Sequence, residues 1–185
     1  MSTPEPTETT ATESTPAAPA PAPAPAQASD AHPRFAAALA ELGLQVEVRR
    51  FPDATRTAAE AAAAVGCELS EIVKSLVFTA DGVPVLVLMD GSSRVDVELV
   101  RRELGAQKVK RADAALVRET TGYAIGGVPP FGHATKTRVL ADRRLLDHAV
   151  VWAAAGTPHT VFPLDPKTLI AHAGATVVDV REPAE

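Results

Sequence analysis

A loop rich in glycine and proline, residues 122–133 (GYAIGGVPPFGH), is the part of the sequence best suited to chemistry. Paired glycines allow the main chain to approach a ligand closely and let successive N–H groups point in one direction. The prolines that follow stiffen the loop and remove competing donors. A rigid loop of this kind suits the stabilisation of an oxyanion or the binding of a phosphate. A tight connection between two strands would also explain it.

Lys74 is the second residue that could take part in chemistry. It follows the apolar pair Ile72-Val73 and precedes an apolar segment, so its aliphatic stem is expected to be covered while its amine reaches a pocket. In that position the amine would bind a phosphate or an ester oxygen as a flexible point charge. The alternative is a solvated lysine at a junction between a helix and a strand.

The other reactive residue types form no recognisable catalytic or metal-binding pattern. The single cysteine, Cys67, excludes an internal disulfide, disfavours a zinc site and has no activating context. His32, His148 and His172 lack the spacing of metal ligands. The sequence also contains no nucleophile elbow, zinc-protease motif, P-loop or dinucleotide-binding motif. We therefore expect no metal and no cofactor.

A basic segment lies between residues 101 and 118. It holds six of the eighteen Lys and Arg side chains, namely Arg101, Arg102, Lys108, Lys110, Arg111 and Arg118. A solvated helix face would explain this segment, because Glu103 and Asp113 lie among the positive charges. Contact of Lys108, Lys110 and Arg111 with RNA phosphates is the sharper alternative.

The periodicity of the apolar residues predicts the elements that must position these side chains. Capping residues and helical spacing predict helices over 34–42, 57–66, 96–104, 113–119 and 165–172, and a short turn from 70. In the third helix Val97, Val100 and Leu104 are expected to point inward. Apolar runs predict strands over 46–51, 75–80, 83–89, 108–110, 137–140, 149–153, 159–162 and 176–180. The Asp81-Gly82 pair predicts a hairpin turn.

Strands and helices alternate irregularly, which favours a single compact α+β domain around a mixed or antiparallel sheet. Residues 31–185 are long enough to bury a sizeable core. Residues 1–30 hold seven of the sixteen prolines and no Lys or Arg, so they cannot bury enough apolar surface and are predicted to form a disordered spacer.

The charge and hydropathy of the chain exclude some classes of protein. The net charge is −5, and residues 1–30 contribute four acidic side chains, so the rest is close to neutral. That balance does not suit a protein that coats nucleic acid through bulk charge. There is no apolar run long enough to cross a membrane and no recognisable targeting segment, which predicts a cytoplasmic protein.

Taken together, the stretches above resemble the YbaK/prolyl-tRNA editing domain family of aminoacyl-tRNA deacylases. The resemblance runs through residues 33–181, and four landmarks in order carry it. They are Ile72-Val73-Lys74-Ser75-Leu76, Arg94-Val95-Asp96, the segment 121–132 (TGYAIGGVPPFG), and Ala155-Gly156-Thr157-Pro158-His159.

This resemblance implies a fold, an activity and partners. The fold would be a compact α+β domain around a mixed, mostly antiparallel and barrel-like sheet with surrounding helices. The activity would be hydrolysis of the ester of mischarged tRNA carrying a small amino acid of the Ala, Cys, Ser and Thr class, often on tRNA for proline. The implied partners are the acceptor end of mischarged aminoacyl-tRNA and an aminoacyl-tRNA synthetase, without a membrane or DNA.

The resemblance also assigns site residues. Lys74 matches the functional lysine of the family, and residues 126–132 match its substrate loop. The implied catalytic residues are Lys74, Gly126, Gly127 and Gly132. The implied substrate-binding residues are Ser75, Val128, Pro129, Phe131, His133, Gly156, Thr157 and His159. Family members usually carry Thr or Asn at the position of Ser75 and often Ser at that of Pro129, so the preferred amino acid stays open.

In the implied mechanism, Lys74 holds the ribose or phosphate of the terminal adenosine, and loop amides near Gly126, Gly127 and Gly132 stabilise the oxyanion. Water is the nucleophile, or the substrate's own side chain where that is a thiol. Two rival interpretations remain open. One is a non-catalytic module that binds aminoacyl-tRNA ends or nucleotides, and the other is a domain recruited to a synthetase through its tail.

Overall fold

The computed structural model describes residues 30–183, so the predicted spacer lies outside the described residues except for Asp30. The elements in chain order are α1 (Pro33–Leu42), β1 (Arg49–Arg50), α2 (Ala58–Val65), η2 (Leu69–Glu71), β2 (Val73–Ala80), β3 (Val83–Asp90), α3 (Val97–Leu104), β4 (Val109–Arg111), α4 (Ala114–Thr121), β5 (Arg138–Asp142), η3 (Arg143–Asp147), β6 (Val151–Ala154), β7 (Thr160–Leu164), α5 (Pro166–Ala173) and β8 (Thr176–Val178). None of the helices among them is long and apolar enough to cross a membrane.

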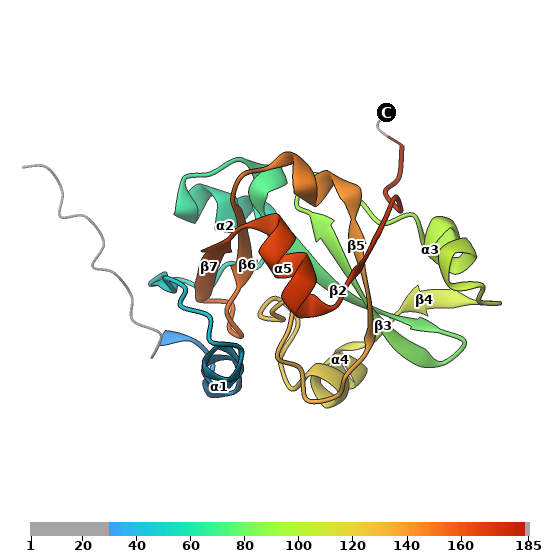
Figure 1. Cartoon of the computed structure of the whole chain (residues 1–185), viewed down its shortest axis with the longest axis horizontal. Coiled ribbons are helices and arrows are strands. Elements are labelled where there is room, and N and C mark those ends of the chain that lie inside the picture. Colours follow the sequence, from blue (N-terminus) through green and yellow to red (C-terminus); the bar gives the residue numbers. More distant parts are fainter. Residues whose placement is uncertain (1–29, 184–185) are drawn as a thin grey trace, which may run out of the picture.

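Two sheets form the framework, and the predicted α+β class is confirmed (Figure 1). The larger sheet has the strand order β4-β2-β3-β5-β8, in which β3, β5 and β8 run parallel and the other pairs are antiparallel. The smaller sheet, β1-β7-β6, is antiparallel. Within residues 30–183 the strands form two open sheets and not a closed barrel, which refines the barrel-like shape that we expected.

The β2–β3 hairpin, which carries Lys74, forms as the sequence predicts. Asp81 and Gly82 both have positive φ angles, 50° and 83°, as a two-residue type I′ turn requires. Its register pairs Val73 with Asp90 and Ala80 with Val83, so the two strands match over eight residues. The hairpin is therefore the long central support of the larger sheet.

Side-chain caps define the helices close to where the sequence places them. Thr57 and Glu60 form both halves of a capping box at the start of α2. Asp96, Asp113 and Asp165 each accept main-chain N–H groups at the starts of α3, α4 and α5. These caps fix the points at which the chain enters each helix.

Two expectations about packing were wrong in detail. Val97 is 37 % exposed instead of inward, because Leu99 packs against the same core as Val100 and shifts the buried stripe away from Val97. The strand expected over 46–51 pairs with β7 only at Arg49 and Arg50. Val48 is fully buried in the core although it precedes the paired residues.

The hydrophobic core is divided by the larger sheet. One cluster includes Val73 and Val77 of β2 and extends to Phe35, Phe131 and Phe162 from α1, the glycine-rich loop and β7. The second cluster lies on the other face, where Phe78 and Val87 pack against α3. Successive residues of β2 therefore face two different environments.

Candidate functional site

One stretch of β2 has no second strand beside it. β2 pairs with β3 along its whole length, but with β4 only over Phe78–Ala80. At the other end a single bridge joins Ile72 to Trp152 of β6. Between these two points a cleft of about 310 Å³ opens along the strand edge.

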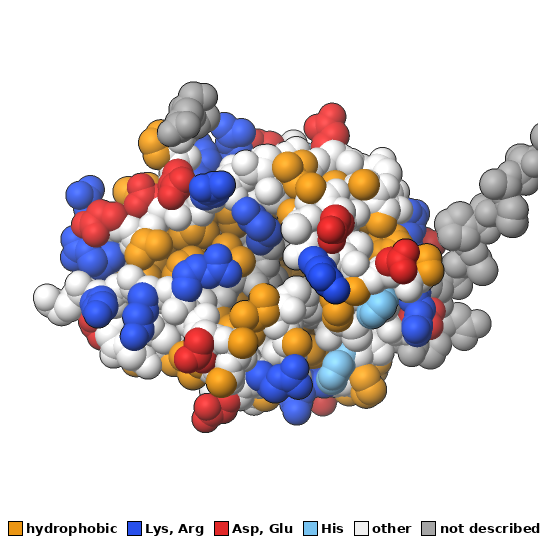
Figure 2. Space-filling view, turned by 180° about the vertical axis from the view of Figure 1, so that it is seen from behind, with side chains coloured by type: hydrophobic (Ala, Val, Ile, Leu, Met, Phe, Trp, Pro, Cys, Tyr) orange, Lys and Arg blue, Asp and Glu red, His pale blue; other side chains and the backbone are white. Residues whose placement is uncertain are grey.

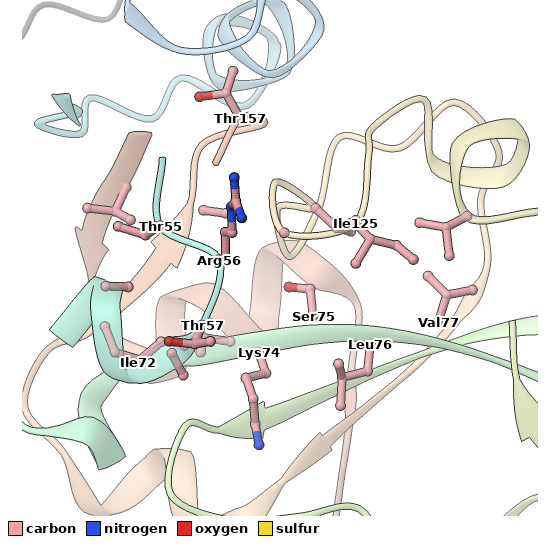
Figure 3. Close-up of a pocket in the computed structure, with 18 of the residues that line it drawn as sticks. Thr55, Arg56, Thr57, Ile72, Lys74, Ser75, Leu76, Val77, Ile125 and Thr157 are labelled. Carbon is pink, nitrogen blue, oxygen red and sulfur yellow. The ribbon is translucent and has the colours of Figure 1, made fainter. Parts of the chain in front are cut away.

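The cleft combines positive charge, hydroxyl groups and small apolar side chains (Figure 3). Its cations are Arg56, Lys74 and Arg111, and no Asp, Glu, His or Cys lines it. The hydroxyl-bearing residues are Thr55, Thr57, Ser75, Thr157 and Thr160. The remaining lining is Ala58, Ala61, Ile72, Val73, Leu76, Val77, Ala112, Val117, Ile125, Gly126, Val128, Trp152, Ala154 and Val161. This composition suits a small ligand that carries negative charge.

Lys74 and Ser75 line the cleft from opposite faces of β2, because side chains alternate along a strand. In Figure 3, Ser75 points to the same side as Val77, toward the space between Arg56 and Ile125, whereas Lys74 points to the other side. The Lys74 Nζ donates a hydrogen bond to the main-chain oxygen of Ser93. The Ser75 Oγ is buried and has no hydrogen-bond partner among residues 30–183.

The surroundings of Lys74 set its charge state. Burial lowers the pKa of the amine, Asp90 opposes that shift, and Arg94 and Arg111 add to it. The pKa of Asp90 is also lowered: burial raises it, but hydrogen bonds from Ser92 and Ser93 and the charge of Lys74 outweigh that cost. Lys74 is thus a partly buried cation that one buried carboxylate compensates.

The glycine-rich loop reaches the cleft through Gly126 and Val128. Gly127 lies behind them, where a Cβ atom would come within 2.9 Å of the Thr157 Cα, so only glycine allows this close approach of two main chains. The N–H of Gly127 donates to Ala124 O at 3.0 Å and is not available to a ligand. Among the described residues, the N–H groups of Gly126 and Val128 have no such partner.

The second half of the loop faces the core instead of the cleft. Phe131 is buried, with its ring 5.4 Å from that of Phe35. The Tyr123 hydroxyl donates to Gly132 O at 2.7 Å, and His133 Nε2 lies 2.7 Å from Pro129 O. Burial lowers the pKa of His133, which favours its neutral form. These residues hold the loop in place and do not line the cleft.

Of the late landmark, residues 156–159, only Thr157 lines the cleft. Thr157 lines the cleft, and its Oγ1 lies 2.7 Å from the Oγ1 of Thr160. Gly156 packs against His32 and Tyr123 behind the cleft. His159 lies outside the lining, where its main-chain O accepts the N–H of Phe51 at 2.8 Å.

Arg56 is a residue of the cleft that the sequence reasoning missed. Its guanidinium projects into the space between Thr157 and Ile125 (Figure 3). The N–H of the preceding Thr55 donates to Pro158 O at 2.8 Å, and the N–H of Arg56 itself donates to Glu60 at 2.6 Å. The capping box that follows Arg56 predicts where α2 starts, but it does not predict the direction of the Arg56 side chain.

The basic residues 108, 110 and 111 lie in and just before β4, and one of them lines the cleft. Arg111 lines the cleft, and its guanidinium carbon lies 5.8 Å from the centre of the Phe78 ring. Lys108 and Lys110 are exposed. Figure 2 shows a face on which Lys and Arg side chains surround a hollow. Cys67, in contrast, packs outside the cleft, and burial raises the pKa of its thiol.

The sequence of residues 52–171 matches the aminoacyl-tRNA editing domain family. The chain belongs to this family. The match spans both β2 and the glycine-rich loop, so it includes every segment that lines the cleft, and the resemblance seen in the sequence is confirmed.

Three proteins illustrate what this chain is similar to. A solved structure, of a protein proposed to be a trans-editing enzyme for prolyl tRNA synthetase, is 44% identical, with a TM-score of 0.77 over 81% of this chain and 96% of that one. The uncharacterized protein YwhH of Bacillus subtilis (strain 168) is 35% identical over 66% of this chain and 78% of its own length. A proline--tRNA ligase of Geobacter sp. (strain M21) is 32% identical over 54% of this chain. That match spans only 18% of the ligase.

Proposed function

We propose that this editing domain hydrolyses the ester bond of tRNA charged with a small amino acid of the Ala, Cys, Ser and Thr class. The observation that supports the proposal is the cleft, whose lining holds three cations and no acidic residue. The cations suit the phosphates of the terminal nucleotides, and a volume of about 310 Å³ suits a small acyl group. The similarity to proline--tRNA ligases favours tRNA for proline, and action beside a prolyl-tRNA synthetase.

The chemistry needs positioning and charge stabilisation more than a protein nucleophile, because an aminoacyl ester is already activated. A water oxygen bonds to the ester carbonyl carbon, the bond from that carbon to the ribose oxygen breaks, and the ribose oxygen takes up a proton. The N–H groups of Gly126 and Val128 donate to the oxyanion that forms in between. A thiol on the substrate's own side chain replaces water where the amino acid carries one.

Lys74, Arg56 and Arg111 bind the phosphates and ribose of the acceptor end in this proposal. Arg56 lies on the same side of β2 as Ser75, Lys74 extends from the opposite face, and Arg111 also lines the cleft. The amine of Lys74 must exchange Ser93 O for a ligand oxygen, which the four rotatable bonds of a lysine side chain permit. The same residues would also serve a module that only binds aminoacyl-tRNA, which is the rival function.

Single-turnover deacylation separates the two functions. The full chain is mixed in excess with alanyl-, cysteinyl-, seryl- and threonyl-tRNA, and release of the amino acid is followed against the uncatalysed rate. Faster release from at least one of these substrates supports the enzyme. Binding of all four without faster release from any would instead establish the non-catalytic module.

A further inference from the structure

The free edge of β2 presents the main-chain N–H and C=O of Ser75 to the cleft. The N–H of Gly91 donates to Ile72 O at 2.7 Å on the β3 side, and the N–H of Ala112 donates to Val77 O at 3.1 Å on the opposite side. Main-chain groups alternate in direction along an antiparallel strand. Residues 72, 74 and 76 therefore bond toward β3, and the N–H and C=O of Ser75 point out of the sheet edge.

Within the described part of the chain, these groups of Ser75 have no hydrogen-bond partner across the edge. Between the Ile72–Trp152 bridge and the start of β4, no main-chain group among residues 30–183 bonds to Ser75 across the edge. The Ser75 Oγ is buried and unpartnered as well. Buried polar groups are rarely left unsatisfied in folded proteins, since each costs free energy. The N–H and C=O of Ser75 thus indicate a binding place for a ligand that carries one hydrogen-bond acceptor and one donor at matching positions.

An aminoacyl ester carries that pair. Its α-ammonium and its ester carbonyl flank one Cα atom, as the N–H and C=O of a residue do in a strand. In a hydrogen-bonded antiparallel pair, two opposed residues exchange both of their N–H···O bonds. We propose that the aminoacyl group docks on the β2 edge as a one-residue strand. Its ammonium donates to Ser75 O, and the N–H of Ser75 donates to the ester carbonyl oxygen.

This arrangement rests on the proposed function and adds two consequences to it. The N–H of Ser75 becomes a second type of oxyanion donor, beside the loop amides at Gly126 and Val128. Directly opposed residues of an antiparallel pair have their side chains on the same face. The side chain of an L-amino acid therefore lies on the face of Ser75 and Val77, and that of a D-amino acid is directed toward Lys74.

Binding of a hydrolysis-resistant probe tests the inference without relying on activity. The full chain, labelled with 15N, is titrated with 3′-(L-alanylamino)-3′-deoxyadenosine and with the matched 3′-(L-lactylamino) compound, in which a hydroxyl replaces the ammonium. The Ser75 amide resonance is expected to shift with the alanyl probe, and the lactyl probe is expected to bind about tenfold more weakly or worse. An unmoved Ser75 resonance at saturation, or equal affinity for both probes, would overturn the inference.

A pair of variants gives a second measurement. Ser75→Pro removes the N–H that faces the edge but none of the β2–β3 bonds, which is the position at which a strand tolerates proline. It is expected to weaken the alanyl probe by about tenfold or more, and Ser75→Ala, which keeps the N–H, by less. Wild-type affinity for the alanyl probe in folded Ser75→Pro contradicts the inference. If that variant does not fold, the comparison of the alanyl and lactyl probes on the wild-type chain is the test. If the wild type hydrolyses alanyl-tRNA but binds both probes equally well, the docking on Ser75 is wrong and the proposed deacylase function is still supported.

Discussion

Lys74 and Ser75 are neighbours in sequence with different tasks. The lysine is partly buried beside Asp90 on the face of α3, and the serine faces the space under Arg56. The alternation of side chains along β2 separates the two. A substitution at one of them should therefore change phosphate binding or acyl binding without changing the other.

Replacement of Lys74 by alanine should lower deacylation at least about tenfold, because it removes a charge-assisted contact with the acceptor end. Single-turnover rates on the best substrate of the wild type measure the effect. Lys136→Ala, which removes an exposed lysine outside this cleft, is the matched control and should keep the wild-type rate. Equal rates in Lys74→Ala and the control would remove Lys74 from the site.

Asp90 should make stability depend on acidic pH. Its carboxyl has a pKa below the ordinary 3.8 in the folded protein, so the unfolded chain binds the proton more readily. Its contribution to the free energy of unfolding is full above pH 3.8 and is lost as the pH falls through the folded-state pKa. Asp90→Asn should cost about 1–3 kcal/mol at pH 7 and progressively less in that acidic range, as urea unfolding would measure. A cost that does not change with pH would contradict this account.

At the scale of elements, the cleft depends on a contact between two loops. Gly127→Ala would place a Cβ atom 2.9 Å from Thr157 Cα, so the loop with Gly126 and Val128 must move away from the cleft. We expect deacylation to fall about tenfold, since small displacements of catalytic donors are costly. Gly43→Ala, at the C-cap of α1 where nothing lies within 4 Å, should lower the thermal midpoint yet keep the activity. Activity lost equally in both variants would mean that general destabilisation is the cause.

Two exposed lysines, Lys108 just before β4 and Lys110 within it, are close in sequence to Arg111 of the cleft. Lys108→Glu combined with Lys110→Glu should weaken tRNA binding at low salt and reduce its salt dependence, because fewer counterions are released. Affinity is measured with uncharged tRNA over a series of salt concentrations. Lys167→Glu on α5 is the control for a change of charge elsewhere. Unchanged affinity in the double variant would show that these lysines are solvated surface residues that do not contact tRNA.

Sequence patterns predicted most elements because their causes are local. The capping box of α2 and the Asp81-Gly82 turn depend on residues within one or two turns of the chain. The short length of β4 along β2, which leaves the edge free at Ser75, is a matter of tertiary pairing. Tertiary packing also explains why the sequence placed Gly127 and Gly132 in the site. In the structure the N–H of Gly127 bonds within the loop, and Gly132 packs against α1. Arg56 was missed because nothing local shows where it points.

At the scale of the whole molecule, residues 31 and 32 are already anchored in the fold. Ala31 is only 6 % exposed, and the N–H of His32 donates to Ala155 O at 3.0 Å. Deletion of residues 1–29 should leave the thermal midpoint unchanged, since their composition offers little to bury. Deletion of residues 1–34 should lower it by several degrees, because it removes these contacts and the start of α1. Thermal unfolding of both truncated chains measures this, and equal midpoints would contradict the boundary.

The recessed edge of β2 also bears on self-association. Unpaired strand edges are templates on which another copy of a protein can add a strand, and this is a common route to aggregation. Here the unpaired stretch is limited by β4 on one side and by the Ile72–Trp152 bridge on the other. The stretch between these two limits is residues 73–77, which is close to the five or six residues of a typical strand. A strand added by a second copy of the chain at this edge is therefore limited to about that length, and it would compete with the proposed ligand for Ser75.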